Sequence, residues 1–323
     1  MASSLDYGNV SHHRLGRAGH AMSGWGSLRW YPKITRIQNH AAVDVGRGSE
    51  TLMTFARGDL FRAARLLALR QRSKALVVTG FYIPAARRPA AESDGPAGAV
   101  ELCAALRGIG GEGWLVSDQP CGPVVTAAAQ DTLPDDHILI APSGAAFELW
   151  FDDIRALVRH EHIDSVIFIE RVGPSFDGIP KNMRGADMLQ WTAPLSRLSR
   201  LGLHTIGIGD GGNEIGMGRI TPSAIADIVL HGETIACRVP THELIVAGTS
   251  NWGGHALVCA LYALGCRSVA SLLDEHWHHA VLGRIAAAGG LDGVTLLNTP
   301  TVDGLSETQY YRQINVLSRL ARS

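Results

Sequence analysis

The 323-residue sequence lacks several features that would indicate a function class. Its five cysteines are odd in number and contain no Cys-x-x-Cys pair. This argues against a zinc knuckle and a disulfide framework, and it favours a reducing compartment. No apolar run approaches the ~18 residues of a membrane span. The net charge of −1 gives no electrostatic reason to expect a nucleic acid or a membrane surface as a partner.

Two further absences concern the N-terminus and the phosphate-binding motifs. The first 30 residues lack the apolar core of a secretory signal, and they carry Arg and Ser in the manner of an organellar transit peptide. We predict a loose tail over residues 1–36 and one domain over residues 37–323, located in the cytoplasm of a bacterium or in the mitochondrial matrix of a eukaryote. No Gly-Lys-Ser/Thr triplet occurs, which excludes a Walker-type loop.

The remaining chain alternates short apolar runs with segments of helical periodicity. The apolar runs are continuous, which is typical of strands covered on both faces. The pattern predicts an α/β fold with a doubly wound, mostly parallel sheet and helices on both faces. The expected strands are 74–81, 113–118, 137–142, 164–171, 204–210, 243–248 and, more weakly, 293–298; the expected helices are 58–72, 97–108, 151–160, 253–265, 271–290 and 306–321.

Polar residues follow four of these expected strands, where ligands bind in parallel sheets. Because the carboxyl ends of parallel strands share one edge, we expect these residues to converge on one site. In chain order they are Glu92 and Asp94, then Glu170, Asn182 and Arg184, then Asp210, and finally Ser250 and Asn251.

The stretch "TIGIGDGGNEIGMGRI" is the most unusual of the chain, because carboxylates stand inside a glycine loop. Asp210, Asn213 and Glu214 are hard oxygen donors, which suits Mg²⁺ or Mn²⁺. Gly211 and Gly212 would let a substrate reach backbone N–H groups. Two alternatives remain: Asp210 only caps a helix, or Gly207, Gly209 and Gly212 form a dinucleotide fingerprint, which the acids disfavour.

Other candidate groups carry weaker signals. His276, His278 and His279 lie in one helical stretch, but their spacings of two and three suit a solvated helix face better than a ligand pair. Ser250 lacks the Gly-x-Ser-x-Gly context of a hydrolase nucleophile.

Together these segments resemble the D-glutamate cyclase-like family, a domain found in a mitochondrial D-glutamate cyclase and alone in bacteria. The resemblance runs from Val45 to Leu305 and rests on "VGRG", "TGF", "ESDGP", "NMRG", "GIGDGGNEIGMG", "SNWGG" and "TVDGL". It implies a hydro-lyase that dehydrates D-glutamate to 5-oxo-D-proline. Ser93 departs from the Thr expected in "ETDGP".

The implied roles follow from the chemistry of this cyclisation. A divalent ion at Asp210, Asn213 and Glu214 would polarise the γ-carboxylate. Glu170 or Asp94 would take the amine proton, and Arg184 would hold the α-carboxylate. Asn182, Gly211, Gly212, Ser250 and Asn251 would complete the substrate site.

Other functions remain open. A metal-dependent phosphatase or related hydrolase could use the same oxygen donors, and so could a non-catalytic protein that binds a metal or an acidic ligand. The expected partner is a small acidic amino acid, and the sequence leaves homo-oligomerisation open.

Overall fold

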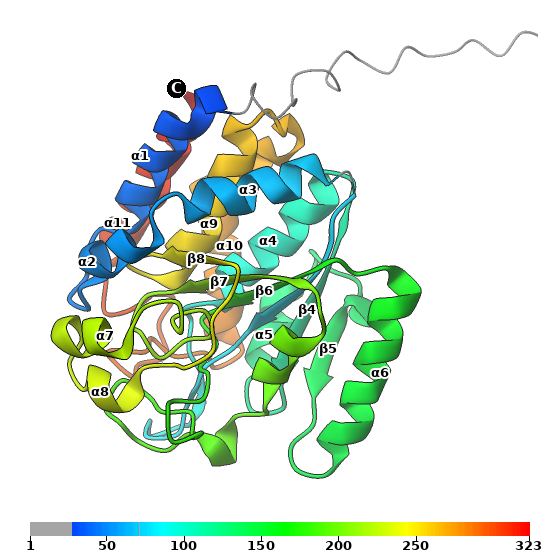
Figure 1. Cartoon of the computed structure of the whole chain (residues 1–323), viewed down its shortest axis with the longest axis vertical. Helices are drawn as coiled ribbons and strands as arrows, with labels where there is room; N and C mark the ends of the chain where they lie inside the picture. The colour runs from blue at the N-terminus through cyan, green and yellow to red at the C-terminus, as the bar shows by residue number, and fades with distance from the viewer. Residues whose placement is uncertain (1–27, 71) are drawn as a thin grey trace, which may run out of the picture.

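A six-stranded, wholly parallel sheet forms the centre of the molecule (Figure 1). The computed structural model describes residues 28–70 and 72–323. The strands lie in the order β5-β4-β1-β6-β7-β8. Their bounds are β1 Lys74–Thr79, β4 Glu112–Asp118, β5 Ile138–Ala141, β6 Ser165–Ile169, β7 His204–Gly209 and β8 Glu243–Val246. The α/β fold and the parallel sheet predicted from the alternating pattern are thereby confirmed.

The order of the strands determines where a ligand can bind. From β1 the chain moves outward through β4 to β5, and it then returns to β6 on the other side of β1. This is the 3-2-1-4-5-6 order of doubly wound sheets, in which the connections reverse direction between two central strands. Here the reversal lies between β1 and β6, so a crevice is expected where Thr79 and Ile169 end these strands.

Helices cover both faces of the sheet (Figure 1). Ala75 and Val77 face the larger layer, whereas Leu76 and Val78 face the smaller one, as the alternation of side chains along a strand requires. The larger layer contains α1 Tyr31–Ala41, α3 Asp59–Leu69, α4 Pro96–Gly108, α5 Gly122–Ala129, α9 Ser250–Ala263, α10 Glu275–Ala287 and α11 Glu307–Arg322. The opposite face is covered by α6 Ala146–Glu161 and, beside β8, by α2 Ser49–Met53, α7 Pro222–Ile228 and α8 Gly232–Ile235.

Short elements complete the fold and correct one prediction. The weak seventh strand at 293–298 is wrong, because these residues form turns. A two-stranded antiparallel hairpin, β2 Tyr82–Ile83 and β3 Ala90–Ala91, follows β1 instead. The 3-10 helices are η1 Leu28–Trp30, η2 Thr54–Ala56, η3 Asp135–His137, η4 Leu189–Trp191, η5 Leu195–Arg200 and η6 Arg267–Leu273.

The N-terminal part of the described chain is already folded before residue 37. Helix α1 packs against α9 and α11, and Ile34 and Ile37 are fully buried. Residues 1–27 of the predicted tail lie outside the described residues, so the division at residue 36 stays a prediction. Within the described chain, no helix has both the length and the apolar character needed to cross a bilayer.

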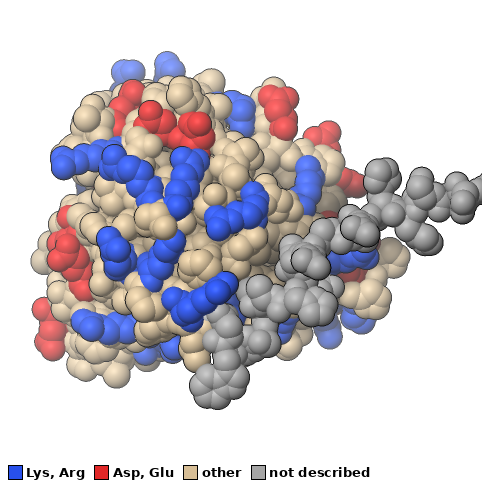
Figure 2. Space-filling view, turned by 90° about the horizontal axis from the view of Figure 1, so that it is seen from above, with Lys and Arg blue, Asp and Glu red and all other residues tan. Residues whose placement is uncertain are grey.

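Basic and acidic residues are distributed differently between the surface and the interior, although the net charge is only −1. Lys and Arg outnumber Asp and Glu on the face seen in Figure 2. Arg171 is the only buried Lys or Arg in residues 28–70 and 72–323, whereas many acids are buried: Asp59, Glu92, Asp94, Glu101, Asp118, Glu170, Asp210, Glu214, Glu243, Asp292 and Asp303. Buried acids need hydrogen bonds or cations, and several of them meet at one place.

Candidate active site

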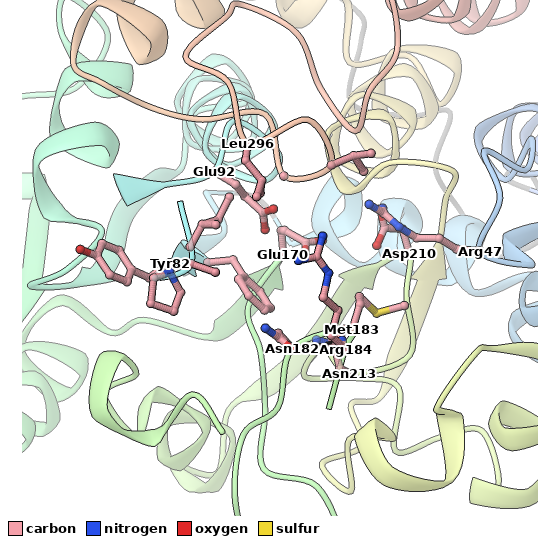
Figure 3. A pocket seen from close by; sticks show the side chains of 16 residues that line it. Arg47, Tyr82, Glu92, Glu170, Asn182, Met183, Arg184, Asp210, Asn213 and Leu296 are labelled. Carbon is pink, nitrogen blue, oxygen red and sulfur yellow. Dashed lines mark hydrogen bonds and ion pairs between the residues drawn. The ribbon is translucent and has the colours of Figure 1, made fainter. Parts of the chain in front are cut away.

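A cavity of about 230 Å³ opens at the reversal point of the sheet (Figure 3). Its volume lies below the ~300–1,000 Å³ typical of drug-sized ligands, so it suits a metabolite the size of an amino acid. Hairpin residues Tyr82 and Ile83 form one wall, and Met183 lies on another. The polar lining consists of Arg47, Glu92, Glu170, Asn182, Arg184, Asp210 and Asn213.

Asp94 lies behind this lining and joins two helices. Its two carboxylate oxygens accept the N–H groups of Ser250 and Asn251, at 2.7 and 2.8 Å, at the start of α9. In return, the Asn251 side-chain oxygen accepts the N–H groups of Gly95 and Gly98 at the start of α4. The N-terminus of each helix is thus capped by a side-chain oxygen from the start of the other helix. The positive ends of both helix dipoles therefore face the same group of acids. Ser250 and Asn251 therefore position the site and do not line the cavity.

Glu170 follows β6 directly and occupies the centre of the site. Its backbone φ is +44°, an uncommon conformation for a residue with a side chain, and such residues cluster at functional sites. The Ser250 hydroxyl donates a 2.6 Å hydrogen bond to a Glu170 carboxylate oxygen. Burial, together with Glu214, Glu92 and Asp94, raises the pKa of Glu170 well above its ordinary value, and the Ser250 hydrogen bond opposes this rise.

Asp210 lies at the end of β7 and is paired with Arg47. The same guanidinium makes a two-pronged contact with Asp303, at 3.0 and 2.6 Å. Burial alone would lower the pKa of Arg47, but Asp210 and Asp303 raise it well above its ordinary value. Burial raises the pKa of Asp210 despite the attraction of Arg47, and Glu170 and Asp303 add to the rise.

The glycine loop is held by its own glutamate. The Glu214 carboxylate accepts three backbone N–H groups, from Asp210 at 3.0 Å, Gly211 at 2.6 Å and Gly212 at 2.7 Å. This geometry corrects three sequence predictions. Glu214, expected as a metal ligand, stabilises the loop and is not one of the three carboxylates that converge. Gly211 and Gly212 were expected to offer their N–H groups to a substrate, but these groups donate to Glu214.

The glycines allow the loop after β7 to fold back against the strand. A Cβ on Gly207 would lie 2.7 Å from the Cα of Gly216, so the strand can accept the returning loop only if it lacks a side chain there. The dinucleotide interpretation of Gly207, Gly209 and Gly212 is not needed to explain them.

Asn213 and the loop after β6 form the rim of the cavity. The Asn213 amide donates to the Lys181 carbonyl oxygen at 2.9 Å, and the Asn182 side chain accepts the N–H groups of Arg184 and Ala186. Arg184 is exposed at the mouth, and its guanidinium has no hydrogen bond or ion pair within the described residues. Arg184 is therefore available to bind an anion.

The carboxyl groups at the centre suit a divalent cation. Oxygens of Asp94, Glu170 and Asp210 all lie within 4.8 Å of one another, and all three residues are buried. Burial raises the pKa of Asp94 to about 8, and Asp303 adds to the rise. For Glu92 the pKa is raised well above its ordinary value by burial and by Asp303. Arg47 alone does not balance these acids, and hard oxygen donors in excess of cations fit Mg²⁺ or Mn²⁺.

Sequence reasoning missed two important residues. These are Arg47 and Asp303, which stand in the segments "VGRG" and "TVDGL". They are separated from Asp210 by many residues, and only the packing of α1 and α11 beside the sheet brings them to it. Glu92, which was expected at this site from its place after the first strand, lines the cavity.

These features define a buried acidic site on a doubly wound α/β scaffold, and comparison with known proteins places the chain in a family. The family model described as "D-glutamate cyclase-like, C-terminal" matches residues 37–318, so the chain belongs to this family. It is 32% identical to human "D-glutamate cyclase, mitochondrial" over 245 residues, which cover 72% of this chain and 39% of the human protein. The chain thus spans well under half of that relative's length.

Proposed function

We propose that the chain is a D-glutamate cyclase-like hydro-lyase that converts D-glutamate into 5-oxo-D-proline and water. One observation carries this proposal within the family. Three buried carboxyl groups converge beside a small cavity whose mouth holds the unpaired cation of Arg184. Such a site can bind an anionic substrate at one end and exchange protons with it at the other.

The substrate would be oriented by its charges. Arg184 lies at the mouth without an ion pair to any residue of 28–70 or 72–323, and it would bind the α-carboxylate through a planar two-point contact. The α-ammonium group would then face the acids, which attract it. Tyr82 and Met183 would enclose the methylene groups and reduce the access of water. This pose brings the amine and the γ-carboxyl group together, which favours ring closure.

The reaction removes two protons from the α-ammonium group, and the carboxylate oxygen that leaves as water must gain two. Glu170 would accept the first proton of the amine, because its raised pKa makes it a stronger base than an ordinary carboxylate and the hydrogen bond from Ser250 orients it. Burial and Asp303 raise the pKa of Glu92 well above its ordinary value, which favours its protonated form, so it would give a proton to the oxygen that leaves as water. After the C–N bond forms, Glu92 would take the second proton from the nitrogen, and Glu170 would pass its proton to the same oxygen. The C–O bond then breaks, water leaves, and both carboxyl groups return to their starting states.

A divalent cation would assist this chemistry. Asp94 and Asp210 would hold it beside Glu170, and when bound it would supply a Lewis acid for the substrate carboxylate. The charge of the transition state would also be stabilised by the positive ends of α4 and α9.

The test is turnover by the purified chain with and without Mn²⁺. D-glutamate, L-glutamate and a phosphomonoester are offered separately, and 5-oxoproline is quantified by chiral chromatography. We expect 5-oxo-D-proline from D-glutamate only, a loss in Glu170→Gln, and no loss in Glu50→Gln, the same substitution at an exposed position. Release of phosphate instead would make the protein a hydrolase. Binding of Mn²⁺ and D-glutamate without turnover would make it a ligand-binding protein.

A further inference from the structure

A second group of potential metal ligands lies inside the larger helical layer. Glu101 of α4, His255 of α9 and His278 of α10 meet there, and all three side chains are fully buried. None of them lines the cavity described above. The group is therefore separate from the proposed cyclase site and does not depend on it.

The donor atoms of this group face one another. The His255 Nδ1 lies 2.7 Å from one Glu101 oxygen and 3.3 Å from the His278 Nε2. The second Glu101 oxygen lies 3.3 Å from the same His278 Nε2. This second oxygen is buried and makes no hydrogen bond within the described residues.

These separations match a shared metal ion. In a tetrahedral zinc site with bonds of ~2.0–2.1 Å, two ligand atoms lie about 3.3 Å apart. The two contacts of His278 Nε2 have this value, whereas the 2.7 Å contact between His255 Nδ1 and Glu101 has the length of a hydrogen bond.

Hydroxyl groups hold the far side of each ring. Ser318 Oγ lies 3.0 Å from His255 Nε2, and the Tyr310 hydroxyl lies 3.2 Å from His278 Nδ1. If each ring donates its outer N–H to that hydroxyl, both inner nitrogens present lone pairs to Glu101. Outer hydrogen bonds of this kind orient histidine ligands in metal sites.

The donor set consists of these three residues. Cys259 lies one turn after His255 on α9 and is fully buried, but its sulfur is not among the atoms that lie within 4.8 Å of one another. Two imidazoles and a carboxylate form a donor set that suits zinc better than Mg²⁺ or Mn²⁺.

We propose that Glu101, His255 and His278 bind a structural Zn²⁺ that ties α4, α9 and α10 together. The site is closed to solvent, so the ion is acquired as the chain folds and stabilises the folded state. No motif indicates this site, because its ligands come from three separate helices. The prediction that His278 belongs to a solvated helix face is wrong, although His276 and His279 are exposed.

Metal analysis of the full chain, produced with Zn²⁺ and without a chelating tag, tests this proposal. We expect about one tightly held zinc per chain in the wild type, and the same content in His276→Gln, an exposed histidine of the same helix. Asp210→Asn should also keep its zinc, because it alters only the cavity. His278→Gln should lose the zinc and melt at a lower temperature.

The wild type alone can also decide the question if the buried variants fail to fold. Zinc-edge X-ray absorption should show two imidazole ligands at ~2.0–2.1 Å. Absence of zinc from the folded wild type, or a shell made only of oxygen atoms, would overturn the proposal. Retention of zinc by a folded His278→Gln variant would do the same, and the group would then be a buried ion pair of Glu101 and His255.

Discussion

Replacing Arg47 by glutamine tests the electrostatic balance of the site most directly. Arg47 pairs with Asp210 and Asp303, whose side chains are 3% and 2% exposed. The variant leaves both carboxylates buried without their cation. Breaking a buried ion pair costs ~3–5 kcal/mol, and because the Arg47 side chain is 19% exposed, we expect the lower end, about 3 kcal/mol.

This loss is large enough to measure by thermal unfolding. At ~2.1 cal/mol/K per residue, a chain of 323 residues has an unfolding entropy of roughly 0.7 kcal/mol/K. A loss of about 3 kcal/mol therefore lowers the melting temperature by about 4 °C. The measurement is made in a chelating buffer, so that a cation cannot replace the guanidinium. Arg184→Gln is the control, since its side chain is exposed and unpaired, and its melting temperature should stay within the error.

The dependence on pH supplies a second check. The pKa of Asp210 is already raised in the fold, and loss of Arg47 raises it further. A carboxyl group whose pKa is higher in the folded state destabilises the fold above its unfolded value of ~3.9, and the cost fades as it protonates. The deficit of the variant should therefore shrink as the pH falls from 8 toward 5. A deficit below about 1 kcal/mol, or one that grows on acidification, would refute this account of Arg47.

Three further predictions concern the acids themselves. Mn²⁺ or Mg²⁺ should raise the melting temperature of the wild type and not of Asp210→Asn, because the ion binds only the folded chain; absence of binding heat at millimolar ion in calorimetry would contradict the metal model. Glu170→Gln should lower turnover but keep the Mn²⁺-induced rise in melting temperature, whereas loss of that rise would identify Glu170 as a ligand. Ser250→Ala removes the hydrogen bond that favours ionised Glu170, so the acidic limb of kcat/KM should move up by about one pH unit; an unmoved limb would show that Glu170 is not the base.

The sheet could be predicted because its signal is local. Each of the six strands is a continuous apolar run, and periodic helices separate them, so burial on both faces is visible in the sequence itself. The segment 293–298 also contains apolar residues, but Leu297 is exposed, and Asp292 accepts the N–H groups of Val294 and Thr295, which turns the chain. A short apolar run flanked by an aspartate can form either a strand or a turn, and the sequence alone does not distinguish the two.

The site was predictable as a location but not as a set of contacts. Glu170 and Asp210 directly follow strands, so the parallel sheet alone places them at one edge. Glu214 belongs to the loop that begins at Asp210, yet its carboxylate accepts three N–H groups of that loop. No pattern of residue types shows whether such a carboxylate points back at its own loop or into the cavity. Arg47 contacts Asp210 from a distant part of the chain, so this contact could be predicted only if the packing of α1 were known.

The exchange of capping groups between α4 and α9 also determines how molecules enter and leave. The two helices approach so closely that a Cβ on Gly254 would lie 3.0 Å from the Cα of Gly98, and Asp94 and Asn251 lock their first turns together. We therefore expect this side of the site to stay closed. Tyr82 and Arg184 line the same cavity from the hairpin and from the loop after β6, so we expect a ligand to enter between these two segments, and their opening to limit how fast it leaves.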